Sequence, residues 1–218
     1  MKNFQEYLEP TEFLNFDRPR VKEKASGIVK GKSSNKEKAI ALFYWVRDEI
    51  RYNMYTYIPQ HKTNLKASTT LRRGHGFCMS KAVLLSTLAR AVEIPARIHM
   101  VDIINHKIPE WVEELMGTNV FYCHGYSELY LDDEWKKLTP VFDRKTALKA
   151  GYTPLVEFDG DNDAMLSKYD SEGNLFVEYI GDHGIYTDVP INEIKDIFEE
   201  EYGEIYTEFN FQRPKRNL

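Results

Sequence analysis

The sequence predicts an α+β fold in which two helices come first and an antiparallel sheet follows. Apolar residues recur every three or four positions over about 36–50 and again after residue 77, which is the helical period. Beyond Pro95 the pattern changes to short extended runs separated by turn residues. Helices that precede the strands, instead of alternating with them, favour α+β over a βαβ arrangement.

The N-terminal 35 residues are polar and are interrupted by Pro10, Pro19 and Gly27, so we expect them to wrap irregularly over the surface. The first helix is predicted from about Lys36 to Ile50. Asn35 is its expected cap, because a short polar side chain satisfies free N–H groups at a helix start. The apolar face of this helix requires a packing partner.

The second helix supplies that partner and is expected to begin near Phe77 or Cys78. Its apolar positions include Ala82, Leu85 and Leu88. It must end before Ile94-Pro95, because proline cannot continue a helix. We expect the two helices to pack together.

The remaining elements are short and lie within one continuous domain, 1–218. Strands are predicted at 96–104, 120–131, 135–141 and about 175–180, and a last helix at about 191–201. Asp132-Asp133 provides the turn between the second and third strands. No repeat or linker divides the chain, so we expect an N-terminal wrap (1–35), a core (36–145) and a C-terminal extension (146–218) packed on it.

Composition excludes several classes of protein. The formal net charge of -5 and the pI near 5.7 argue against nucleic-acid binding, which needs clustered basic residues. No secretory signal or membrane-spanning run is visible, so we expect a soluble, cytoplasmic protein. The two cysteines, Cys78 and Cys123, do not suggest a disulfide framework.

Cys78 has the sequence context of a nucleophile. It follows the turn Gly74-His75-Gly76-Phe77 and opens the second helix. Free N–H groups and the positive end of the helix dipole favour the thiolate, which is the attacking form of cysteine. The same N–H groups can stabilise the oxyanion that forms at an attacked carbonyl.

His124 is the candidate base. It lies in the strand 120–131, where it shares one face with Tyr122, Tyr126 and Glu128, whereas Cys123 points the other way. Cys123 is therefore expected to be structural. A histidine within hydrogen-bond reach of the thiol could accept its proton.

These residues resemble the transglutaminase-like superfamily, a branch of the papain-like cysteine enzymes. The similar blocks are Gly76 to Cys78, Ala82 to Leu85, Leu88 to Arg97 and His124 to Trp135, with weaker likeness at 156–160 and 179–190. The resemblance covers about 36–145 well. It implies a papain-like α+β fold and a Cys-His-Asp triad that works without a cofactor.

The third triad residue departs from the family pattern. The position where the family usually carries aspartate is Thr139, followed by Pro140. Asp143 has the same strand parity as Thr139, and a two-residue turn at Asp133-Glu134 would place it across from His124. A tighter turn would favour Thr139. We predict Asp143 as the orienting carboxylate, with Thr139 as the alternative and Glu128 assigned to a structural or substrate-contacting role.

Other signals rank lower. A zinc site from His75, Cys78, Cys123 and His124 has poor spacing, because the side chains of Cys123 and His124 diverge. The acidic run 159–163 lacks the glycine of a calcium loop and is better explained as a solvated turn. His183 is expected to be merely polar. The tyrosines at positions 52, 55 and 57 are expected to pack in the core or at its rim, and lining of the cleft is their alternative role.

The predicted function is cysteine-dependent acyl transfer on a peptide or protein carboxamide. Cys78 would attack the carbonyl, His124 would move the proton, and water would release the thioester. Transamidation to an amine is the alternative for the second step. A catalytically inert peptide-binding or scaffold module is the rival from another class, supported by Thr139. No cofactor, metal or membrane partner is predicted.

Overall fold

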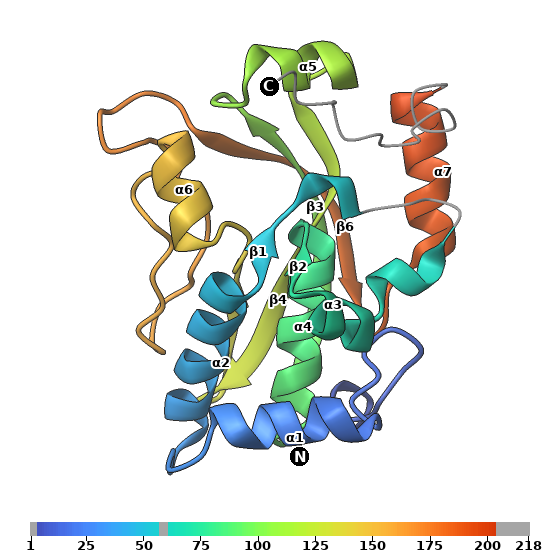
Figure 1. The fold of residues 1–218 in the computed structure, drawn as a ribbon, viewed down its shortest axis with the longest axis vertical. Coiled ribbons are helices and arrows are strands. Elements are labelled where there is room, and N and C mark those ends of the chain that lie inside the picture. The colour runs from blue at the N-terminus through green and yellow to red at the C-terminus, as the bar shows by residue number, and fades with distance from the viewer. Residues whose placement is uncertain (1–3, 57–60, 204–218) are drawn as a thin grey trace, which may run out of the picture.

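The computed structural model describes residues 4–56 and 61–203. Its centre is a four-stranded sheet of order β5-β4-β3-β6 (Figure 1). The strands are β3 (Ala96–Asn105), β4 (Val120–Leu131), β5 (Glu134–Leu138) and β6 (Val177–Tyr186). Every pairing in this sheet is antiparallel, which confirms the predicted α+β class.

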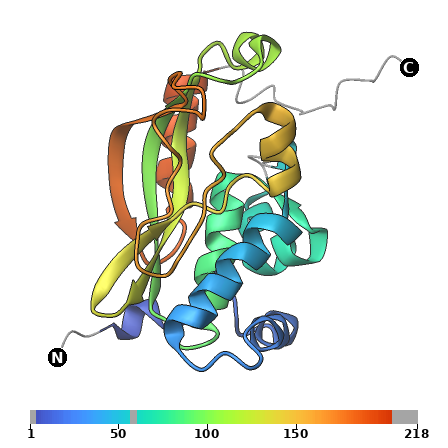
Figure 2. The same ribbon diagram turned by 90° about the vertical axis from the view of Figure 1, so that its left-hand side faces the viewer.

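Helices cover one face of the sheet, with α4 lying directly against it (Figure 2). The helices are α1 (Pro19–Ile28), α2 (Asn35–Glu49), α3 (Ala67–Arg73), α4 (Cys78–Arg90), α5 (Glu110–Met116), α6 (Arg144–Ala150) and α7 (Ile191–Tyr202). Short pieces complete the chain: η1 (Gln5–Tyr7), β1 (Arg51–Tyr52), η2 (Met54–Thr56), η3 (Lys62–Leu65) and β2 (His75–Gly76). The larger apolar core lies between the sheet and the helices α1, α2, α3, α4 and α7.

The expectation of an irregular N-terminal wrap is wrong for α1. Pro19 occupies the first turn of this helix, where its fixed φ is favourable and its missing N–H costs nothing. Val21 and Ala25, four residues apart, are fully buried against the helical layer. The cap of α2 also differs from the prediction: Ser34, not Asn35, accepts the N–H of Glu37, whose side chain bonds back to Ser34.

Helix α4 is the central element, and every residue from Met79 to Arg90 is buried. A helix enclosed on all sides needs partners for its polar side chains. Lys81 donates to the carbonyls of Arg47 and Ile50 at the end of α2, at 3.0 and 2.6 Å. Ser127 of β4 donates to the Ala82 carbonyl at 2.8 Å. These bonds attach α4 to its neighbours, and the predicted packing of α4 against α2 is confirmed.

The hairpin between β4 and β5 turns at Asp132-Asp133, as predicted. Both residues have positive φ, 47° and 67°, which suits a tight two-residue turn. Leu131 pairs with Glu134 as a result. Strand β5 ends at Leu138, earlier than the predicted 141, and Pro140 could not continue the ladder because it lacks an N–H.

The C-terminal elements differ from the sequence prediction in one case. Strand β6 begins at Val177 and continues to Tyr186, beyond the predicted 175–180, because it pairs along the length of β3. Helix α7 matches the predicted 191–201 closely. Among residues 4–56 and 61–203, no helix is both long and apolar enough to cross a membrane.

Candidate active site

Cys78 is the first residue of α4 and follows β2 directly. The turn before it is tightly packed: the N–H of Phe77 donates to Ser80 Oγ at 2.9 Å. A Cβ on Gly76 would collide with Ser80 Oγ and approach the Thr70 methyl to 3.2 Å. Because position 76 is glycine, the backbone can pass close to Ser80 and Thr70 just before α4. This close packing fixes the position of Cys78.

Backbone N–H groups favour the thiolate of Cys78. Those of Gly125 on β4 and of Met79 and Cys78 at the start of α4 each lower the pKa of the thiol. Burial outweighs them and raises the pKa of Cys78 to about 11. A Cβ on Gly125 would lie 2.6 Å from Met79 Sδ and 3.2 Å from Met79 Cα. Strand β4 therefore contacts the start of α4, where Cys78 lies, through Gly125, the residue after His124.

His124 is 3% exposed, and its burial lowers the pKa of the imidazole to about 4. Its Nε2 lies 3.3 Å from Thr139 Oγ1. The ring is thus held from the Nε2 side, which leaves Nδ1 available for a second partner. Thr139 is itself 1% exposed.

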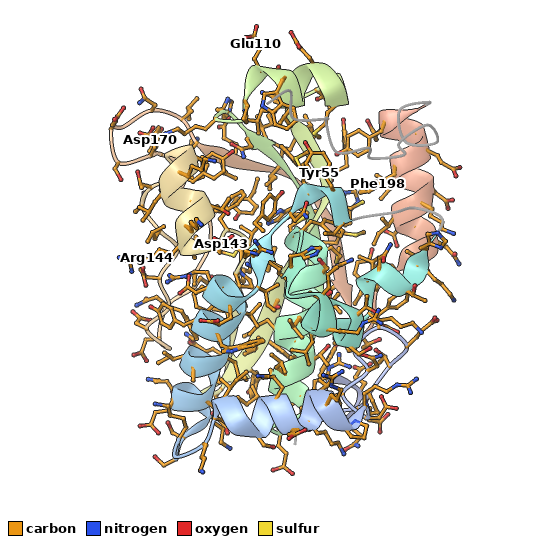
Figure 3. All side chains as sticks on the ribbon, viewed as in Figure 1. Tyr55, Glu110, Asp143, Arg144, Asp170 and Phe198 are labelled. Atoms are coloured by element: carbon orange, nitrogen blue, oxygen red, sulfur yellow. The ribbon has the colours of Figure 1, made fainter. Side chains whose placement is uncertain are left out.

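Asp143 lies elsewhere, at the start of α6, and Figure 3 shows it between α6 and β1. Its carboxylate accepts the N–H of Tyr52 at 2.7 Å and the N–H and hydroxyl of Thr146 at 2.9 and 2.7 Å. Although burial opposes the effect, these bonds hold its pKa below the ordinary value. None of the hydrogen bonds among the described residues joins Asp143 to His124. The register premise behind Asp143, a turn at Asp133-Glu134, is wrong because the turn is one residue earlier.

A bulge in β4 sets the direction of His124. Cys123 has φ 56°, and the β3–β4 register shifts between Val101 and Ile103. Asp102, in the bulge, accepts the N–H of Cys123 at 3.0 Å and bonds His183 Nε2 at 2.7 Å. His183, expected to be merely polar, thus supports the backbone immediately before His124. The thiol of Cys123 is buried in the main core.

Glu128 belongs to a separate buried network further along the same strand. Its carboxylate pairs with Arg97 at 2.6 Å and with His99 Nδ1 at 2.7 Å. His99 Nε2 bonds Asp182 at 2.9 Å. Burial opposes protonation of His99, but these two carboxylates outweigh it and raise the pKa. Sequence reasoning missed His99, although its place on the neighbouring strand provided the signal.

An aromatic pair packs against the same apolar cluster as Cys78. The Tyr52 ring packs on Phe142 with centroids 4.8 Å apart, in the second apolar cluster, to which Cys78 also belongs. Figure 3 shows Tyr55 on η2, and Phe198 on the side of α7 that faces η2. The prediction for Tyr57 lies outside the described residues.

The acidic turn 159–163 is stabilised within the chain. The Asp159 carboxylate accepts the N–H groups of Asp161 and Asn162 at 2.8 and 2.9 Å, and Lys36 pairs with both Asp161 and Asp132. Over residues 4–56 and 61–203, no three His, Cys, Asp or Glu side chains gather in a way that could hold a metal ion.

A cysteine at a helix start, packed against a strand that carries a buried histidine, defines the papain-like class of cysteine enzymes. Residues 22–140, more than half of the chain, match the transglutaminase-like superfamily. The chain belongs to this family. No curated protein matches the sequence significantly.

One solved structure agrees with the fold. The chain is similar to a "Putative Cysteine Protease from Cytophaga hutchinsonii", with TM-score 0.50, 17% identity, 84% of this chain covered and 54% of the other. It thus spans about half the length of that protein. Less similar are a "putative protease from Parabacteroides distasonis" (TM-score 0.39, 15% identity, 62% and 25% covered) and a "TGase" (TM-score 0.39, 14% identity, 58% and 31% covered).

Proposed function

We propose that this protein is a cysteine-dependent acyl-transfer enzyme that hydrolyses amide or peptide bonds through a thioester on Cys78. The observation that carries the proposal is the close packing of β4 on the start of α4, where a Cβ on Gly125 would lie 3.2 Å from the Cα of Met79, the residue after Cys78. Gly125 follows His124 in β4, so the nucleophile and the base belong to segments in direct contact.

The reaction begins with transfer of the Cys78 proton to Nδ1 of His124, since Nε2 faces Thr139. The sulfur attacks the carbonyl carbon, and N–H groups at the start of α4 stabilise the oxyanion. The imidazolium returns its proton to the leaving amine as the carbon–nitrogen bond breaks. Water, deprotonated by His124, then attacks the thioester and releases a carboxylic acid and the thiol.

Both groups are neutral at pH 7, because the pKa of Cys78 is about 11 and that of His124 about 4. Proton transfer between the separate groups costs roughly 10 kcal/mol, at about 1.4 kcal/mol per pKa unit. Attraction between the resulting ions recovers about 4 kcal/mol if they lie about 4 Å apart at an effective dielectric of about 20. In this proposal His124 acts as a general base during attack and not as half of a preformed ion pair.

Thr139 takes the place of the family's orienting carboxylate in this proposal. Its hydroxyl can fix the ring of His124, but it has no charge with which to stabilise an imidazolium. Asp143 is committed to Tyr52 and α6. The proposed site is thus Cys78, His124 and Thr139.

A catalytically inert scaffold remains the second candidate function. Both the neutral forms of Cys78 and His124 and the absence of a carboxylate at Thr139 favour low catalytic activity. The test is to trap the acyl-enzyme: p-nitrophenyl acetate is added, the reaction is quenched in acid, and the acetyl group is located by peptide mass spectrometry. We expect acetylation of Cys78 in wild type and in the matched control Cys123→Ala, and slower labelling in His124→Ala.

Labelling at sites unaffected by Cys78→Ala would contradict the enzyme and favour the scaffold. Release of the acetyl group in water with and without a primary amine then separates hydrolysis from transamidation. Hydrolysis predicts a deacylation rate that does not depend on amine concentration.

A further inference from the structure

A groove separate from the Cys78 site runs between α1, α2 and α3. It encloses about 1080 Å³, at the upper end of the roughly 300–1,000 Å³ typical of small-molecule pockets. Helix α1 crosses the end of the helical layer away from β1 (Figure 1). The size and position of the groove suit an extended segment better than a small ligand.

The rim of the groove is basic although the whole chain is acidic. Its charged lining residues are Arg18, Arg20, Lys24 and Arg72, against a single acid, Glu23. Within the described part of the chain, none of these four basic residues forms an ion pair. The formal charge of the protein is -5, so this local excess of positive charge is opposite in sign to the net charge of the whole chain.

The floor of the groove is apolar and partly aromatic. Val21 is fully buried at its base, and Ile28, Leu71 and Trp45 also line it. The Lys24 ammonium lies 5.3 Å from the centre of the Trp45 ring, within the range of a cation–π contact. An occupant must therefore combine negative charge with an apolar side chain.

We propose that this groove binds an acidic peptide segment of a partner protein, with an apolar side chain over Trp45 and carboxylates toward Arg20 and Arg72. The basic rim of the groove favours a negatively charged occupant. Its apolar floor favours a peptide, which can add an apolar side chain, over a polyanion that has none. A long nucleic acid would extend onto the acidic remainder of the surface and be repelled. Because exposed charges provide the attraction, the affinity falls as salt is added.

The test uses the full chain carrying Cys78→Ala, so that binding is measured without turnover and independently of the catalytic proposal. Fluorescence anisotropy follows a fluorescein-labelled peptide, Glu-Asp-Glu-Leu-Glu-Asp, and its Gln/Asn counterpart. We expect saturable binding of the acidic peptide at 50 mM salt, at least tenfold weaker binding of the neutral one, and weaker binding at 300 mM salt.

The double substitution Arg20→Glu and Arg72→Glu should weaken binding at least tenfold. Lys22→Glu, an exposed position on α1 that does not line the groove, is the matched control and should change it less than twofold. Replacing the peptide leucine with serine should also weaken binding. Equal loss in the Lys22 variant, equal affinity for the neutral peptide, or tighter binding of an oligo(dT) strand would each overturn the proposal.

Discussion

Thr139→Asp places a carboxylate behind the imidazole of His124. In wild type, the hydroxyl of Thr139 lies 3.3 Å from His124 Nε2, and it offers no charge to balance a proton on the ring. Aspartate is close in size to threonine but branches at Cγ instead of Cβ, so its oxygens reach one bond further toward the ring. We therefore expect the carboxylate to contact His124 and to raise its pKa.

The magnitude follows from the buried position. The pKa of His124 is lowered to about 4 from 6.5, which corresponds to about 3 kcal/mol against the imidazolium. An opposite charge within hydrogen-bond reach raises a pKa by about 1–3 units. The thiolate–imidazolium pair should then become roughly 10- to 1,000-fold more populated at pH 7.

The assay is alkylation of Cys78 by iodoacetamide between pH 5 and pH 9, in a Cys123→Ala background so that one thiol reports. Thr139→Asn controls for the shape of the new side chain without its charge, and Thr139→Val removes the hydroxyl. Alkylation at pH 7 should be fastest in the aspartate variant and slowest in the valine variant. The folded state of each variant is checked by circular dichroism.

Two outcomes would refute this reasoning. If the aspartate and asparagine variants alkylate equally fast, charge at position 139 does not reach His124. If the valine variant matches wild type across the pH range, the Thr139 hydroxyl has no part in orienting the ring.

Three further predictions concern the supports of the site. Gly125→Ala should push β4 away from Met79, lowering the free energy of unfolding by about 1–3 kcal/mol in urea and slowing acylation; unchanged acylation would contradict the packing argument. Asp143→Asn should weaken its bonds to Tyr52 and α6 at a cost of about 1–3 kcal/mol, yet leave the pH profile of alkylation unshifted. Burial lowers the pKa of Lys81 to about 7, so the unfolded state binds the Lys81 proton more tightly than the folded state. The free energy of unfolding should therefore rise by about 2 kcal/mol from pH 7 to pH 9. Lys81→Met should abolish that rise.

The sequence predicted the elements whose apolar pattern and boundaries are local. The start of α4 at Cys78 and the limits of β4 and α7 follow from glycine, proline and periodicity. Helix α1 was missed because its short apolar stripe, Val21 and Ala25, lies within a polar stretch. Its burial depends on helices that come later in the chain.

The surroundings of the candidate site were less accessible to sequence reasoning. Asp102 and His183 are 81 residues apart and meet only because β6 pairs with β3 around a bulge. The sequence alone predicts that Lys81 is an exposed helix residue. It is buried because the end of α2 packs beside it and accepts its hydrogen bonds. Contacts of this kind depend on the register between paired strands. A single β-bulge shifts that register for every residue beyond it.

The residue behind His124 is determined by the hairpin more than by the choice of side chains. Because the turn falls at Asp132-Asp133, Ser127 pairs with Leu138, and continuing that register would set residue 141, not Asp143, opposite His124. The chain instead leaves β5 after Leu138, before Pro140, and Asp143 caps α6. The Asp143 carboxylate is engaged by Tyr52 and Thr146, and none of the hydrogen bonds among the described residues joins it to His124. Position 139 is therefore the place where a carboxylate can be added without refolding the site.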